Sequence, residues 1–127
     1  MLDAFFNAEQ DSYAILQLKL NENRRDVAFM PMRYLRAVGK EPDPNNYELV
    51  YVGELKDYSQ KLNVLLEQLF AKFNMNRPDD FHGHSLSVSD VVGVKMNGEV
   101  SFHFVDSIGF EPLPGFSIER GKEVPEA

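Results

Sequence analysis

The chain has 127 residues, 43% of them hydrophobic and 26% charged, which is the size and composition of one globular domain with a single core. It has no cysteine, which excludes disulfides, thiolate catalysis and cysteine-based zinc sites, and no run of about 20 apolar residues that could span a bilayer. The net charge of −7 combines a balance of +1 in residues 1–40 with one of −8 in residues 41–127, and the acidic part should repel nucleic-acid phosphates.

The first strand is predicted over residues 12–19, where apolar side chains point to both faces. Pro31 suits the first position of a short helix that runs to Val38, and Gly39 suits its C-terminal cap. A second strand is predicted over residues 47–52. Its alternation places three side chains on one face: Tyr47, Leu49 and Tyr51.

The clearest helix of the chain is predicted over residues 57–73. Its apolar residues recur at spacings of three and four, which places them on one stripe that packs on a core. That stripe consists of Leu62, Leu65, Leu66, Leu69, Phe70 and Phe73.

The strongest local signal is a β-hairpin, with strands over residues 91–96 and 99–105. Both central residues of a tight hairpin turn need positive φ, which Asn97 and Gly98 adopt readily. This turn sets a register in which Gly93 lies opposite Phe102, so that the phenyl ring can cross the sheet where no side chain stands.

The elements follow the order β-α-β-α-β-β, which is an α+β arrangement. We expect a four-stranded mixed or antiparallel sheet with the one long helix packed on a face. Residues 12–116 form a single domain, residues 1–11 an N-terminal arm and residues 117–127 a flexible C-terminal tail. The first residues lack the basic and long apolar regions of a secretory signal, so we expect a cytoplasmic protein.

A metal site is the first chemistry to weigh, because His82 and His84 alternate after Asp80. On an extended segment the two rings point the same way, and a nearby carboxylate could complete part of a zinc site. Gly83 makes the segment flexible, however, and no third ligand is set by the spacing. We therefore predict no metal and no cofactor.

Nucleophilic catalysis is the second chemistry, because Ser85, Ser87 and Ser89 lie between His84 and Asp90. The segment lacks the Gly-x-Ser-x-Gly pattern of a nucleophile elbow. These hydroxyls are expected to bond backbone groups in turns, and we predict no catalytic residue.

A carboxylate pair is the third possibility, since Asp90 and Asp106 both stand at the open end of the hairpin. The register places Asp90 opposite Val105 and Asp106 opposite Ser89, on different faces, so the two cannot share a proton or a substrate. Each is predicted to be a cap or turn residue. His103 is predicted to be partly buried with its hydrogen bonds satisfied.

Gly-His-Ser at 83–85 and Ser-Val-Ser-Asp-Val-Val at 87–92 are the most specific of several blocks that follow one another along the chain. Taken in order, these blocks resemble the YodL-like domain of Firmicutes and other gut bacteria, and the resemblance covers residues 12–116. His82 stands where that family usually has Arg or Lys, which weakens the metal interpretation. The other matching blocks are residues 29–30, 46–55, 72–74, 77–82 and 105–110.

The resemblance implies a bacterial cytoplasmic domain associated with mobile or conjugative elements, including their large polyvalent proteins. It brings no catalytic residue and favours binding or regulation over catalysis. We therefore expect a non-enzymatic interaction domain with an unidentified protein partner. The binding surface is expected to comprise Asp80, Phe81, His82, His84, Ser85, Ser87, Ser89, Asp90 and Asp106.

Two alternatives stay open. One is a metal-dependent or hydrolytic enzyme that uses Asp80, His82, His84 and Asp90. The other is a nucleic-acid-binding accessory protein, the least favoured, which would have to use an early basic cluster that acidic residues interrupt. That cluster consists of Lys19, Arg24, Arg25, Arg33, Arg36 and Lys40.

Overall fold

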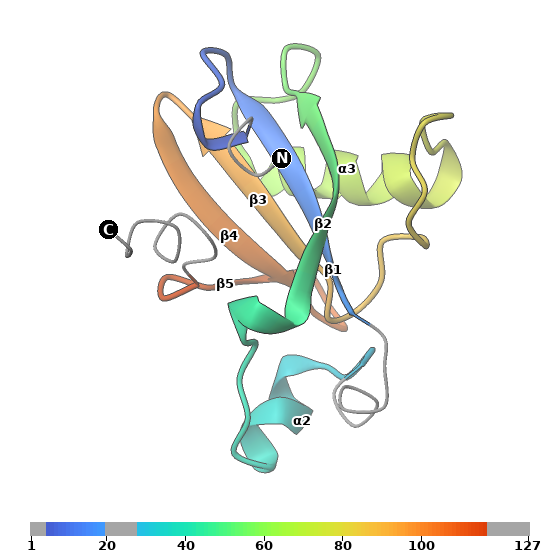
Figure 1. The fold of residues 1–127 in the computed structure, drawn as a ribbon, viewed down its shortest axis with the longest axis vertical. Helices are drawn as coiled ribbons and strands as arrows, with labels where there is room; N and C mark the ends of the chain where they lie inside the picture. The colour runs from blue at the N-terminus through green and yellow to red at the C-terminus, as the bar shows by residue number, and fades with distance from the viewer. Residues whose placement is uncertain (1–4, 20–27, 117–127) are drawn as a thin grey trace.

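The computed structural model describes residues 5–19 and 28–116. Within them, one five-stranded sheet has the order β2-β1-β3-β4-β5, and all neighbouring strands are antiparallel (Figure 1). Its strands are β1 (Ser12–Leu18), β2 (Tyr47–Glu54), β3 (Val91–Met96), β4 (Glu99–Val105) and β5 (Phe110–Pro112). The helices are α2 (Met32–Ala37), α3 (Leu62–Met75) and the short 3₁₀ helix Pro44–Asn46. The α+β class is confirmed, and β5 is a strand beyond the predicted four.

The sheet separates two apolar layers. The long helix α3 covers one face, as Figure 1 shows, and the other face is covered by shorter segments, among them α2 and Phe116. Every residue of β1 is buried, as predicted for a strand with apolar side chains on both faces. None of the helices in these described segments is long and apolar enough to cross a membrane.

The predicted stripe of α3 is buried through Leu65, Leu66, Leu69 and Phe73, while Leu62 and Phe70 lie at its margins. The predicted start of this helix, at residue 57, is wrong, because α3 begins at Leu62. Before it, side chains compete for the backbone groups that a helix would use. The backbone N–H of Ser59 donates to Gln68 Oε1 (2.8 Å), and that of Lys61 donates to Ser59 Oγ (3.0 Å).

The predicted β3–β4 register is confirmed, and the turn has positive φ at Asn97 (53°) and Gly98 (83°). Gly93 does lie opposite Phe102. A Cβ at Gly93 would stand 2.9 Å from Phe102 Cε1, so the ring occupies the space that a side chain would need. The hairpin is therefore set by its own residues.

The expectation that Tyr47, Leu49 and Tyr51 share one face is wrong for Tyr51. A β-bulge shifts the register of β2, so that Ile15 pairs with Tyr51 while Leu16 pairs with Leu49. The extra residue reverses the alternation beyond it. Tyr47 and Leu49 thus lie in the layer away from α3, and Tyr51 lies in the layer under α3.

The predicted C-terminal cap of α2 is confirmed. Gly39 has φ of 75°, its N–H donates to Arg36 O (3.1 Å), and Lys40 N–H donates to Leu35 O (2.7 Å). This pair of bonds, closed by a left-handed glycine, satisfies carbonyls at the helix end. Pro31 stands one position earlier than predicted, as the N-terminal cap residue, where it supplies no side-chain hydrogen bond.

Two expectations fall outside the described residues. They are the C-terminal tail at 117–127, and Arg24 and Arg25 of the basic cluster. Within the described part of the predicted N-terminal arm, Phe5 is fully buried and packs against Phe102.

Candidate functional site

A buried amide on β1, an interior strand of the sheet, anchors the loop that precedes β3. Gln17 Nε2 donates to His84 O (2.8 Å) and to Asp90 Oδ2 (3.1 Å), and the N–H of His84 donates to Gln17 Oε1 (3.2 Å). The loop passes so close here that a Cβ at Gly83 would collide with Gln17 Oε1. Both polar ends of the Gln17 side chain are thus used to hold the loop against β1.

Asp90 lies at the bottom of this network. It is 1% exposed, and its Oδ2 also accepts a hydrogen bond from the N–H of Ser87 (2.8 Å). Burial raises the pKa of Asp90 to about 7, although the hydrogen bonds from Ser87 and Gln17 act in the opposite direction. The other oxygen, Oδ1, faces His84 Nε2 at 3.9 Å.

His84 connects this buried carboxylate to the surface. Its Nδ1 lies 2.8 Å from Ser85 O and 3.3 Å from Gln17 Nε2, and its Nε2 faces Asp90 Oδ1. The side chain is 34% exposed, and its ring lies 5.5 Å from the ring of Phe29.

Two strained residues meet at the same place. Phe29 and Ser89 have φ of 64° and 84°, a region that side-chain-bearing residues rarely adopt. They are bonded to each other, because the N–H of Phe29 donates to Ser89 Oγ (3.0 Å). The carbonyl of Ser89 accepts a hydrogen bond from the buried Tyr47 hydroxyl (2.6 Å). The phenyl ring of Phe29 nonetheless stays 48% exposed.

The residues predicted for the binding surface differ in accessibility. Phe81, Ser89 and Asp90 are buried, and Phe81 packs against Phe73 with ring centroids 4.9 Å apart. Asp80 and His82 are exposed, and Asp80 accepts a hydrogen bond from the Tyr51 hydroxyl (3.0 Å). The partly exposed ones are His84, Ser85, Ser87 and Asp106. The buried members can therefore only support a surface from beneath.

Asp106 caps a helix that is distant in sequence. Its Oδ1 accepts hydrogen bonds from the N–H of Met32 (3.0 Å), the first residue of α2, and from that of Ser107 (2.8 Å). It thereby satisfies a helix N–H for which Pro31 has no side-chain acceptor. The prediction that Asp90 and Asp106 are cap or turn residues is confirmed.

The hydroxyls of Ser87 and Ser89 bond backbone groups, as predicted. Ser87 Oγ donates to Ser85 O (2.7 Å), and Ser89 Oγ is bonded to Phe29, so neither is bonded to the His84 ring. In residues 5–19 and 28–116, no cluster of three or more histidine, aspartate and glutamate side chains could hold a metal ion. His103 is more deeply buried than the predicted partial burial, and its Nε2 lies 2.8 Å from Ser101 Oγ; burial lowers its pKa.

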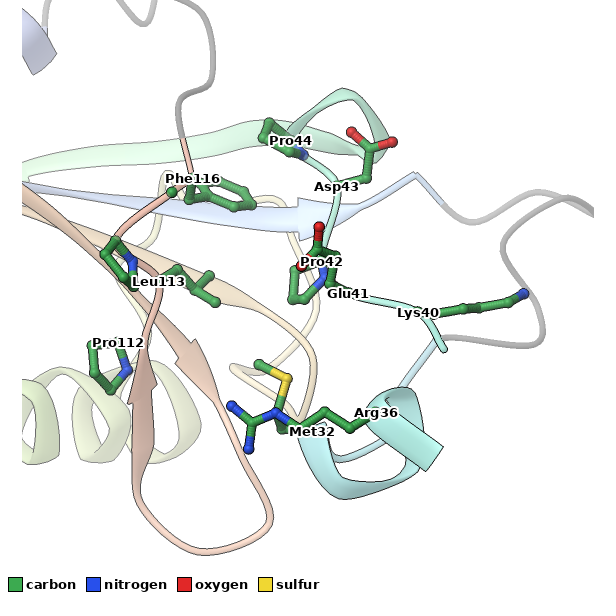
Figure 2. A pocket seen from close by; sticks show the side chains of 12 residues that line it. Met32, Arg36, Lys40, Glu41, Pro42, Asp43, Pro44, Pro112, Leu113 and Phe116 are labelled. Carbon is green, nitrogen blue, oxygen red and sulfur yellow. The ribbon is translucent and has the colours of Figure 1, made fainter. Parts of the chain in front are cut away.

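A groove of about 660 Å³ opens between α2 and the segment that follows β5. Figure 2 shows Pro112, Leu113 and Phe116 on one side of it and Pro42 and Pro44 on the other, with Arg36 at the α2 end. The guanidinium of Arg36 is paired with Glu111 (2.9 Å), so the charge of this groove is already partly neutralised. The groove does not adjoin His84 or Asp90 through any lining residue.

Sequence reasoning missed three residues of the network: Gln17, Phe29 and Tyr47. The signal for Gln17 was its polar amide in an otherwise apolar strand. Phe29 gave no local signal of its positive φ, and the bond from Tyr47 to Ser89 spans 42 positions in the chain.

The fold and the site together define a small antiparallel α+β domain in which a strained, hydrogen-bonded loop is held against the interior strand β1. The model of the YodL-like domain family matches residues 12–116, and the chain belongs to that family. The resemblance seen in the sequence is thereby confirmed. No curated protein and no solved structure matches the chain.

Proposed function

We propose that this chain is a non-enzymatic interaction domain that binds a protein partner through the surface formed by Phe29 and His84. The observation that carries the proposal is the Phe29 ring, half exposed on a backbone that has positive φ. We further propose that the domain acts in the bacterial cytoplasm in association with a mobile or conjugative element, a role favoured by the YodL-like resemblance.

The energetics of this site favour recognition over packing alone. A non-glycine residue in the left-handed region costs of the order of 1–3 kcal/mol, and such strain collects at binding and switch sites. Phe29 and Ser89 both carry it, and their mutual hydrogen bond holds them together. An aromatic side chain held in place but left half exposed is typical of the anchors at protein interfaces.

The polar groups below this surface favour binding rather than chemistry. Asp90 is enclosed by hydrogen bonds from Gln17 and Ser87, and the hydroxyls of Ser87 and Ser89 are engaged with backbone atoms. Their arrangement suits a support that fixes the His84 ring in one orientation, because Ser85 O and Gln17 hold the ring and backbone of His84.

The test is quantitative capture of partners from a bacterial lysate by the intact protein and by Phe29→Ala. We expect the alanine variant to capture at least about tenfold less partner, since truncating a dominant interface anchor costs about 2 kcal/mol or more. Ile108→Ala is the matched control, because Ile108 is 92% exposed and contributes an apolar side chain elsewhere. Circular dichroism checks that both variants are folded. Unchanged capture by a folded Phe29→Ala variant would refute the proposal.

A further inference from the structure

Strand β2 forms one edge of the sheet (Figure 1). Leu55 N–H donates to Asp11 O, and the register continues with Tyr13 opposite Gly53. Because bonded and non-bonded pairs alternate in an antiparallel ladder, the N–H and C=O of Val52 and Glu54 point away from β1. In the described part of the chain no backbone group pairs with them.

The apolar side chains of this edge are only half buried, on both faces of the sheet. Leu49 and Val52 pack against the layer away from α3, while Val50 and Tyr51 pack against the layer under α3. A neighbouring strand would cover side chains on both faces at once. The edge therefore offers apolar contacts as well as open backbone groups to a further strand.

The two charged residues of β2 itself are both acidic. Glu48 and Glu54 are exposed near its two ends, and Asp80 is bonded to Tyr51 between them. Neither glutamate has an ion-pair partner in residues 5–19 and 28–116. A partner strand that carries cationic side chains at both ends would meet an opposite charge at each.

A second copy of the chain fits this edge poorly. If two β2 strands paired antiparallel, the exposed Glu48 and Glu54 of one copy would meet the same acidic edge of the other copy. Like charges across a strand pair destabilise it. The bulge at Leu49 and Val50 also shortens the regular part of the edge. A shorter regular edge disfavours pairing with the edge strands of other molecules.

We propose that β2 binds an extended segment of a partner protein by strand addition, and that this segment has an apolar centre flanked by lysine or arginine. The main chain of Val52 and Glu54 supplies hydrogen bonds, and Glu48 and Glu54 select the charged ends of the segment. This surface is separate from the one formed by Phe29 and His84, so the two proposals can fail independently.

The probe is a fluorescent peptide as long as β2 that alternates threonine and valine and has lysine at both ends. Its binding to the full chain is measured by anisotropy, beside the same peptide with glutamate at both ends. We expect the lysine-ended peptide to bind at least about tenfold more tightly, because two favourable charge pairs replace two unfavourable ones. A lysine-ended peptide with N-methyl groups on its central residues should not bind, since it cannot form the ladder.

A charge exchange tests the location. The protein with both Glu48→Lys and Glu54→Lys should prefer the glutamate-ended peptide. The matched control is Glu67→Lys with Glu99→Lys, two exposed sites whose exchange alters the net charge equally, and here the preference for lysine should persist. Phe29→Ala should bind the lysine-ended peptide as the unchanged protein does.

Several outcomes would overturn the inference. Equal binding of the N-methylated peptide would exclude strand addition, and a reversal of preference in the control pair would assign the effect to net charge. If the lysine-ended peptide does not saturate the protein at about 1 mM, the inference is also contradicted. Sedimentation that shows a dimer of the unchanged protein, lost in Val52→Pro, would make a second copy the occupant instead.

Discussion

The two ends of the β3–β4 hairpin are built in opposite ways. At the turn, Asn97 and Gly98 provide the required positive φ themselves, and no atom lies within 4 Å of where a Cβ of Gly98 would be. At the open end, Ser89 and Asp90 are held by side chains from far along the chain, among them Gln17. One end depends on local conformation and the other on buried polar bonds. Substitutions at the two ends should therefore destabilise the protein by different mechanisms.

The sharpest contrast should come from the titration of Asp90. Since burial raises the pKa of Asp90 to about 7 in the folded state, against about 3.8 ordinarily, the folded state binds a proton that the unfolded state has released. The stability contributed by this group is complete below about pH 4, falls as the pH rises to about 7, and then levels. In Asp90→Asn this dependence should vanish.

The measurement is the free energy of unfolding by urea at several pH values. The difference between the unchanged protein and Asp90→Asn should shift by up to about 4 kcal/mol across this range, because one pKa unit corresponds to about 1.4 kcal/mol. Asp79→Asn, at an exposed carboxylate, should run parallel to the unchanged protein. Parallel curves for Asp90→Asn would show that Asp90 is ordinarily charged in the folded state.

Tyr47→Phe should destabilise the open end of the β3–β4 hairpin without altering the charge of the protein. The change removes the donor to Ser89 O and leaves that buried carbonyl unsatisfied, which costs about 1–3 kcal/mol. Tyr34→Phe is the control, because Tyr34 is exposed and should lose almost nothing. Equal urea midpoints for the two variants would mean that the bond contributes nothing to stability.

Gly98→Ala should destabilise the turn of the β3–β4 hairpin through backbone strain alone. The left-handed φ of 83° costs a residue with a Cβ about 1–2 kcal/mol, and no steric contact adds to it. Gly115→Ala has the same open surroundings without a positive φ and should be neutral. The amide resonances of Phe29 and His84 should stay in place, and their displacement would contradict the independence of the two ends.

Asp106→Ala should have the smallest effect, about 1 kcal/mol or less, as the loss of a cap at a partly buried helix end. Hydrogen exchange of the Met32 amide should become faster, because its acceptor is gone. Asp79→Ala should leave this rate unchanged. If Met32 exchanges at the same rate in Asp106→Ala, the cap is not formed in solution.

The same division explains what could be predicted from the sequence. The register of the hairpin was predictable because it follows from Asn97 and Gly98. The orientation of Tyr51 was not, because it depends on a bulge against β1 that leaves no mark in the apolar pattern of β2. β5 escaped notice because it has three residues and ends in Pro112, too short for a periodicity.

For the candidate site, the chemistry of single residues was predictable and their assembly was not. The capping role of Asp106 followed from its place after a strand, but its helix lies 74 positions away. The buried position of Asp90 depends on Gln17, which is 73 positions away. Such pairs form only when the strand order brings them together, and that order has no local signal.

The place of β1 in the sheet has a consequence for synthesis. It is the first strand in the chain, yet it lies between β2 and β3, and its partner β3 begins only at Val91. While the ribosome is still making α3, one edge of β1 lacks its partner strand β3. The side chains of β1, which are buried in the folded protein, are then still exposed. Stable folding should therefore wait until the hairpin has emerged, and a fragment that ends after α3 should aggregate rather than fold.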